Sequence, residues 1–291
     1  MNREIFSTAD WEQSPLYADL KTREVIEAGF NSVEEGYVNL AEQVPDNLRR
    51  CTEAWTSERI DSQIELDNKF IVKVLEQIKD LAEASNRPIT VLFDIDQTIA
   101  QLIMTSDGSK DNYTLVRPAA SVLCKLIEEL YGDRLDIGML TSRSYPHLQE
   151  ELRQPTYTEA LGDRFNPDHV YSCRPDDNSN IGQDIDDDLV HYTLFNPQHA
   201  KGSPELTRAM LGNVVDDLTL YVLDEDPENL DIADMLMPKI VAYNWAVGQH
   251  PDRSFVFADD DPSLEYIEGS HSDRARAVCV QSMGFYLNQF A

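Results

Sequence analysis

An apolar, β-prone run that ends in two aspartates is the feature that most constrains this chain. The run Ile89–Phe93 (ITVLF) has the composition of a strand buried on both faces, which is typical of parallel sheets. Asp94 and Asp96 follow it at once. Ligands of such sheets bind beyond the carboxyl ends of the strands, so both carboxylates are expected at a ligand site.

Further β-prone runs alternate with helical patterns along the rest of the chain. This alternation predicts an α/β domain over residues 89–291, built on a doubly wound parallel sheet. A hairpin is expected at about 101–116, around the turn signal Asp107-Gly108. The other expected strands are 136–140, 169–173, 218–223 and 239–244, and the expected helices are 118–131, 146–161 and 203–211.

Residues 1–88 are expected to form a helical N-terminal region that lacks catalytic motifs. Apolar side chains recur at helical spacing over residues 57–84, and Asn86-Arg87-Pro88 then ends the helix. Two interpretations of this apolar stripe stay open. It packs on its own domain, or it binds a partner, with a homodimer through these helices as one case.

The charge balance narrows the range of partners. The chain has 53 acidic and 24 basic residues, and its net charge is -29. Such a surface repels phosphate backbones and anionic lipids, which argues against nucleic-acid and membrane partners. Adaptation to high salt and an ordinary solvated surface both explain this acidity. The four cysteines form no CxxC pair, and neither a secretory signal nor a bilayer-spanning stretch is visible, so a cytoplasmic protein is expected.

Asp94 and Asp96 have the chemistry that phosphoryl transfer requires. A carboxylate is a competent nucleophile toward phosphorus and forms an acyl phosphate. Two neighbouring carboxylates repel each other and therefore need a cation, and Mg²⁺ prefers hard oxygen ligands. An acid two residues further on can protonate the leaving alcohol and then activate water. The alternative is that Asp-x-Asp simply ends a strand.

Three downstream elements fit the same chemistry. Thr141-Ser142-Arg143 follows an expected strand, where a hydroxyl can bind phosphate or simply cap a helix. Lys201 precedes an expected helix, where its ammonium can neutralise nucleophile and phosphate or remain an ordinary surface charge. Asp224 and Glu225 follow the expected strand 218–223, where they suit a Mg²⁺ site beside Ile89–Phe93 or belong to an acidic loop.

A second apolar run that ends in acidic residues is an alternative to Asp224 and Glu225 as the metal-binding segment. The apolar run at 255–257 leads into Asp259, Asp260 and Asp261. Asp224 is the preferred candidate, because its distance from Lys201 suits one helix and one strand. The expected strand 239–244 would then follow, as a sheet of this type needs.

Taken in order, these elements resemble the four motifs of the haloacid dehalogenase (HAD)-like superfamily over residues 88–245. The resemblance implies that Asp94 is the nucleophile and a Mg²⁺ ligand. It implies that Asp96 is the general acid and base and binds Mg²⁺ through its backbone carbonyl. Thr98 would shape the loop at the substrate. Gln97 departs from the pattern, since Gly or Glu is frequent there.

The same resemblance assigns roles to the later motifs. Thr141 would bind phosphate, with Ser142 and Arg143 beside it as substrate-binding residues. Lys201 would steady the intermediate. Asp224 would bind Mg²⁺, and Glu225 would bind it directly or through water, although Asp is commoner at that position.

Asp96 favours the phosphatase branch, because dehalogenases and P-type ATPases of this superfamily lack an acid there. The hairpin at 101–116 is too short for a helical cap, and residues 174–198 can form only a small lid. An open site suits a bulky phosphoester such as a phosphoprotein. Alternatively, the N-terminal helices or a second subunit close the site over a small metabolite. Transfer to an acceptor other than water and a catalytically weak interaction scaffold are the rival functions.

Overall fold

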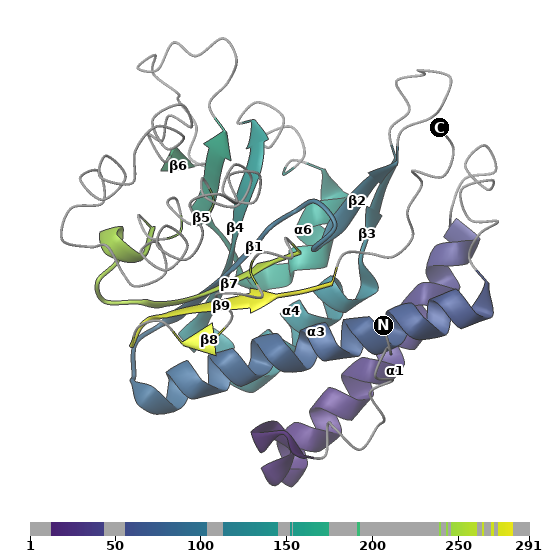
Figure 1. The fold of residues 1–291 in the computed structure, drawn as a ribbon, viewed down its shortest axis with the longest axis horizontal. Helices are drawn as coiled ribbons and strands as arrows, with labels where there is room; N and C mark the ends of the chain where they lie inside the picture. The colour runs from purple at the N-terminus through teal and green to yellow at the C-terminus, as the bar shows by residue number, and fades with distance from the viewer. Residues whose placement is uncertain are drawn as a thin grey trace, which may run out of the picture.

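The fold is built on a seven-stranded sheet with strand order β6-β5-β4-β1-β7-β9-β8 (Figure 1). The computed structural model describes residues 13–43, 56–103, 113–144, 152, 154–174, 191–192, 239, 243, 246–260, 264, 269–270 and 273–281. The strands are β1 (Ile89–Phe93), β4 (Leu135–Ser144), β5 (Phe165–Arg174), β6 (His191–Tyr192), β7 (Ser254–Asp259), β8 (Gly269–Ser270) and β9 (Ala275–Cys279). Neighbouring strands are parallel except for β8 and β9.

β1 lies at the point where the strand order reverses. From β1 the chain passes to β4, β5 and β6 on one side, and later returns to β7 on the other side of β1. Sheets of this Rossmann-like kind bind ligands beyond the carboxyl ends of the strands at such a reversal. The predicted α/β class and its parallel sheet are therefore confirmed, and Asp94 follows the strand at the reversal.

The two faces of β1 belong to different hydrophobic cores. Val91 and Phe93 lie in one cluster of buried side chains, and Leu92 lies in the other. Alternate residues of a strand point to opposite faces, so a strand covered on both sides must be apolar throughout. This requirement explains the continuous apolar run.

Helices α1 (Leu20–Gln43), α3 (Ser57–Ala84) and α4 (Pro118–Tyr131) cover the first face. Figure 1 shows α3 running along this face, with α1 crossing beside it. Phe70, Ile71 and Leu75 of α3 are buried in the same core as Val91. The apolar stripe of α3 thus packs on its own protein, while a homodimer through these helices remains a prediction.

Several expected boundaries agree with the structure. The helices at 57–84 and 118–131 and the first strand have the predicted bounds. The hairpin is present as β2 (Ala100–Ile103) and β3 (Tyr113–Val116), paired antiparallel. β4 and β5 are longer than expected, and α6 (Pro155–Leu161) occupies the second half of the expected helix 146–161.

One expected strand is wrong. Lys239 and Tyr243 are the described residues of the expected strand 239–244, and both are helical, which contradicts that strand. Tyr243 packs under the second face of the sheet, and its hydroxyl donates to the carbonyl of Phe255 at 3.1 Å. The expected helix 203–211, the strand 218–223, most of the loop 174–198 and the Asp107-Gly108 turn lie outside the described residues. Among the described helices, none is long and apolar enough to cross a bilayer.

Gly138 of β4 leaves no room for a side chain between β4, β5 and β1. A Cβ added there would lie 2.2 Å from the carbonyl oxygen of His169 and 2.8 Å from a methyl carbon of Leu92. Gly138→Ala is therefore expected to lower the free energy of unfolding by about 2–3 kcal/mol, because the backbone of β5 would have to move. Chemical denaturation measures the loss.

Gly132→Ala is the control for this substitution. Nothing lies within 4 Å of an added Cβ at Gly132, but its φ is +55°. Only backbone strain opposes that change, because φ of 55° with ψ of -135° is a conformation that residues with a Cβ rarely adopt, and the expected loss is about 1–3 kcal/mol. A Gly138→Ala protein as stable as the wild type would contradict the steric explanation.

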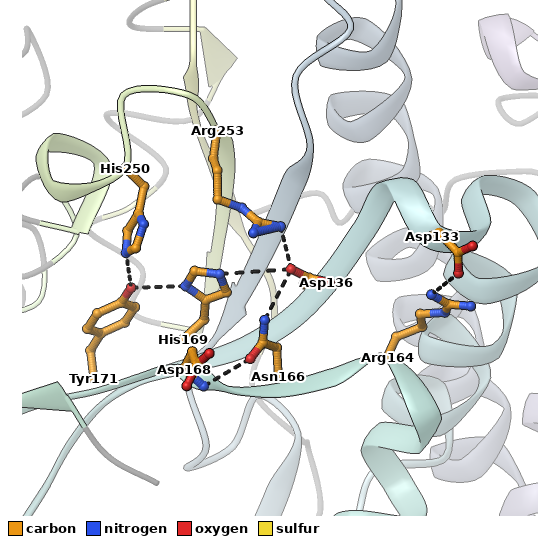
Figure 2. Close-up of polar contacts among 9 residues, drawn as sticks. All are labelled: Asp133, Asp136, Arg164, Asn166, Asp168, His169, Tyr171, His250 and Arg253. Carbon is orange, nitrogen blue, oxygen red and sulfur yellow. Dashed lines mark hydrogen bonds and ion pairs between the residues drawn. The ribbon is translucent and has the colours of Figure 1, made fainter. Parts of the chain in front are cut away.

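A buried polar network surrounds His169, toward the amino ends of the central strands (Figure 2). His169 is 3% exposed. Its Nδ1 lies 3.2 Å from the Tyr171 hydroxyl, and its Nε2 lies 3.9 Å from Oδ2 of Asp136. The Asp136 carboxylate also accepts a hydrogen bond from Arg253. Burial, followed by the positive charge of Arg253, lowers the pKa of His169 to about 4.

This lowered pKa predicts acid sensitivity. The unfolded chain takes up the proton near pH 6.5, whereas the folded chain does so only near pH 4. The stabilisation from neutral His169 is thus complete above pH 6.5 and is lost as the pH falls toward 4. Between pH 7.5 and 4.5, the His169→Gln variant is therefore expected to lose less free energy of unfolding than the wild type, by on the order of 1–2 kcal/mol. Urea unfolding at pH 7.5 and 4.5 tests this, and equal pH dependence in both proteins would contradict it.

Candidate active site

Asp94 and Asp259 lie side by side at the carboxyl ends of two adjacent parallel strands, β1 and β7. The register pairs Phe93 of β1 with Ala258 of β7, so the next residues of both strands lie side by side. The backbone N–H of Asp94 donates to the carbonyl of Ala258 at 3.0 Å. Both aspartates are buried, with exposed fractions of 2% and 0%. The sheet register therefore brings together two acids that are far apart in the sequence.

Asp260 completes a cluster of three carboxylates. Oxygen atoms of Asp94, Asp259 and Asp260 lie within 4.8 Å of one another. Oδ1 of Asp94 is buried and accepts no hydrogen bond from the residues that the structure describes. A buried carboxylate oxygen without a partner is costly unless a cation satisfies it, and hard divalent cations prefer such ligands. These residues therefore fit a divalent metal ion.

Lys239 lies against the same carboxylates. Its Nζ is 2.6 Å from Oδ2 of Asp259 and 3.4 Å from Oδ2 of Asp94. Sequence reasoning missed this residue, because the apolar residues after it were interpreted as a strand. A signal was present nonetheless, since Lys239 precedes a buried strand that ends in consecutive aspartates.

The electrostatic field of this cluster acts strongly on Asp94. Burial raises the pKa of Asp94 to about 8, and the negative charge of Asp259 adds to the rise. Lys239 opposes it, while Asp96 and Asp260 contribute further in the upward direction. Among the described residues, the single ammonium of Lys239 faces four carboxyl groups, those of Asp94, Asp96, Asp259 and Asp260. This excess of acidic groups favours the binding of a cation.

The loop after β1 separates the two predicted catalytic acids. Gln97 has φ of 65°, a left-handed conformation that is uncommon for residues with a Cβ. Its N–H donates to the carbonyl of Ala100 at 2.8 Å, and the Ala100 N–H donates back to Ile95 at 3.0 Å. This compact turn leaves Asp96 exposed while Asp94 stays buried. It also explains why glycine would suit position 97.

Thr98 contacts the acidic cluster from the same loop. It is fully buried, and its hydroxyl donates to Oδ1 of Asp260 at 3.4 Å. Thr141 is buried at the carboxyl end of β4, two residues beyond the register pair of Phe93 with Met139. Thr141 thus flanks the loop from the other side of β1. The backbone of Ser142 and Arg143 continues β4.

The remaining predicted site residues are not brought to this place by the described structure. Lys201, Asp224 and Glu225 lie outside the described residues, so their roles stay predictions. Both edges of β1 are occupied, by β4 and β7. The strand that ends at the acidic cluster beside β1 is β7, and the Mg²⁺ site expected at Asp224 and Glu225 stays a prediction. Comparisons with protein-family models, curated proteins and solved structures find no match for this chain.

Proposed function

We propose that this protein is a Mg²⁺-dependent phosphatase of the HAD-like type, which hydrolyses a phosphate monoester through a phospho-aspartate on Asp94. The observation that carries the proposal is the cluster of Asp94, Asp259 and Asp260 with Lys239, at the strand reversal. The resemblance of residues 94–98 to the first HAD-like motif supports it. In this proposal Asp259 and Asp260 take the metal-binding role given to Asp224 and Glu225, and Lys239 takes that of Lys201.

The first half-reaction transfers the phosphoryl group to the protein. A carboxylate oxygen of Asp94 forms a bond to phosphorus while the bond from phosphorus to the ester oxygen breaks. Asp96, exposed at the mouth of the site, gives its proton to the leaving alcohol. Lys239 holds the Asp94 carboxylate in place and offsets negative charge on the transferred group.

The second half-reaction returns Asp94 to its starting state. Asp96, now ionised, takes a proton from a water molecule that attacks phosphorus. The bond between phosphorus and the Asp94 oxygen breaks, and inorganic phosphate leaves. When bound, Mg²⁺ screens the repulsion between Asp94 and the anionic phosphate. Asp94, Asp259 and Asp260 would hold this ion.

The substrate class is inferred from the short insertion after β1 and from the charge of the chain. The hairpin of β2 and β3 is the described insertion between the first strand and α4, and it is small. We infer a small phosphoester or a phosphoprotein as substrate, rather than a nucleic acid, because a net charge of -29 repels polyanions.

Hydrolysis of p-nitrophenyl phosphate tests the proposal. The purified protein is expected to release p-nitrophenol with Mg²⁺ and to lose this activity in EDTA, with recovery when Mg²⁺ is added back. Asp259→Asn should raise the Mg²⁺ concentration needed for half-maximal rate at least about tenfold, since it removes a charged ligand. If the wild type stays inert over a panel of phosphoesters, the scaffold interpretation is favoured instead.

A further inference from the structure

A fully buried arginine joins the loop after β1 to the N-terminal helices. Arg117 lies directly before α4 and is 0% exposed. A charged side chain is almost never buried to this degree unless its partners satisfy it. Its contacts extend in two directions, toward α1 and α3 on one side and toward the loop on the other.

The first set of contacts holds the guanidinium against α3. Nε and Nη2 of Arg117 each lie 2.8 Å from Oδ1 of Asp67, which is itself fully buried. Gln63 donates to the same oxygen at 2.8 Å, and the Tyr37 hydroxyl of α1 donates to Oδ2 at 2.7 Å. The centroid of the Phe70 ring lies 5.0 Å from the guanidinium carbon. The two N-terminal helices thus fix the arginine in one orientation.

The close approach of α1 to α4 belongs to this arrangement. A Cβ added at Gly36 of α1 would lie 2.7 Å from Cβ of Pro118, the residue that follows Arg117. Only a glycine lets α1 come this near. The same approach brings Tyr37, the next residue along α1, to Asp67.

The second set of contacts holds the loop. Nη1 of Arg117 donates to the carbonyls of Gln97 at 3.4 Å and Thr98 at 3.3 Å. The Arg117 backbone N–H donates to the carbonyl of Ile99 at 2.9 Å. These three carbonyls belong to the turn in which Gln97 has φ of 65°, a conformation that needs support from outside the loop.

We propose that Arg117 is a positioning residue: held by Asp67 and Tyr37, it fixes the left-handed turn that carries Asp96, so that α1 and α3 are part of the catalytic unit. The kinetic consequence rests on the proposed phosphatase function, whereas the effect on the loop does not. Arg117 itself is buried behind the loop and acts on the reaction only through the placement of Asp96 beside Asp94.

Amide hydrogen exchange and steady-state kinetics of two variants test this proposal. Asp67→Asn removes the charge that orients Arg117, and Tyr37→Phe removes one hydrogen bond from Asp67 and leaves the ion pair. In Asp67→Asn the N–H groups of Gln97, Ile99 and Ala100 are expected to lose protection, while those of β1 keep it. The kcat should fall about 10- to 100-fold with little change in KM, because the acid is misplaced rather than removed. Tyr37→Phe should show a smaller loss in the same direction.

Arg134→Met provides the matched control. Arg134 also donates to backbone carbonyls, those of Ala82 and Ser85 at the end of α3, far along the helix from Asp67. Its loss should lower stability without changing loop protection or kcat. If Asp67→Asn does not fold, Tyr37→Phe still gives the readout.

Each result bears on one of the two proposals. Unchanged protection of the loop amides in both variants would overturn the positioning role. Lost protection with an unchanged kcat would overturn its link to catalysis. A wild type that hydrolyses no phosphoester would overturn the proposed function, while the exchange data would still decide whether Arg117 holds the loop.

Discussion

Asp94→Asn is expected to abolish phosphoester hydrolysis and, at the same time, to make the metal-free protein more stable at pH 8. The two effects have one cause, because the buried carboxylate that is proposed to attack phosphorus lies beside Asp259 and Asp260. An amide is no nucleophile, and it carries no charge for those neighbours to repel. Active-site residues often lower stability in this way.

The sign of the stability effect follows from the pKa of Asp94. Burial and neighbouring acids raise this pKa from 3.8 to about 8 in the folded state. The unfolded chain therefore releases the proton near pH 4, whereas the folded chain keeps it until about pH 8. The stability of the wild type falls across this window, whereas the amide that replaces the carboxylate in the variant does not ionise. A gain of on the order of 2 kcal/mol is expected at pH 8.

Thermal denaturation in EDTA measures this gain, which corresponds to roughly 5 °C in Tm for a chain of this size. The difference between wild type and variant should shrink as the pH is lowered to 5, and added Mg²⁺ should stabilise the wild type more than the variant. Asp163→Asn, at an exposed carboxylate, is the control and should leave Tm nearly unchanged. A variant that is less stable than wild type at pH 8 would contradict the explanation.

Lys239→Met is expected to cause the largest combined loss of activity and stability. The ammonium lies 2.6 Å from Asp259 and 3.4 Å from Asp94, and both of these carboxylates are buried. Its removal leaves buried negative charges without their cationic partner, a change that typically costs about 3–5 kcal/mol. Activity should fall at least about 100-fold, since the charge that is proposed to steady the Asp94 carboxylate is lost.

Lys201→Met is the matched comparison, because it removes the same charge at the position that the sequence favoured. It should retain activity within about threefold, because the proposal gives the role of the ammonium to Lys239. Parallel assays with p-nitrophenyl phosphate and urea denaturation in EDTA give both readouts. A large loss of activity in Lys201→Met with a fully active Lys239→Met would return the role to Lys201.

The parts of the fold that local patterns determine were predictable. α3 has a long apolar stripe and a clear stop after it, and α4 begins at a proline, so their bounds agree with the structure. β1 is apolar throughout because both of its faces are covered, and this property is readable in five residues. The aspartates that follow β1 were likewise expected at a site, since the ends of parallel strands gather there.

The parts that depend on strand order were not predictable. Two acidic strand ends competed for the place beside β1, and nothing in either segment shows which of them pairs with it. The register of β1 with β7 brings Asp259 to Asp94, whereas Asp224 lies outside the described residues. Tyr243, Ala246 and Val247, which follow Lys239, are helical and buried in the core on the second face of the sheet, and an apolar run of this kind is also compatible with a strand.

The pairing of Arg117 with Asp67 was also not predictable, because it depends on tertiary contacts. The two residues are separated by 50 positions, and each alone has the properties of an ordinary surface charge. Only the packing of α3 on the sheet buries both of them. Charge pairs of this kind depend on how helices dock, which periodicity in the sequence does not determine.

The central place of β1 also affects when the candidate site is completed during synthesis of the chain. β1 and β4 leave the ribosome early, but β7 follows only after residue 253, and β7 occupies the other edge of β1. Long-range pairings of this kind form late, because a large loop must close first. Asp94 thus meets Asp259 and Lys239 only when most of the chain has been made. A nascent chain can therefore assemble the early part of its core while Asp94 still lacks the rest of the acidic cluster.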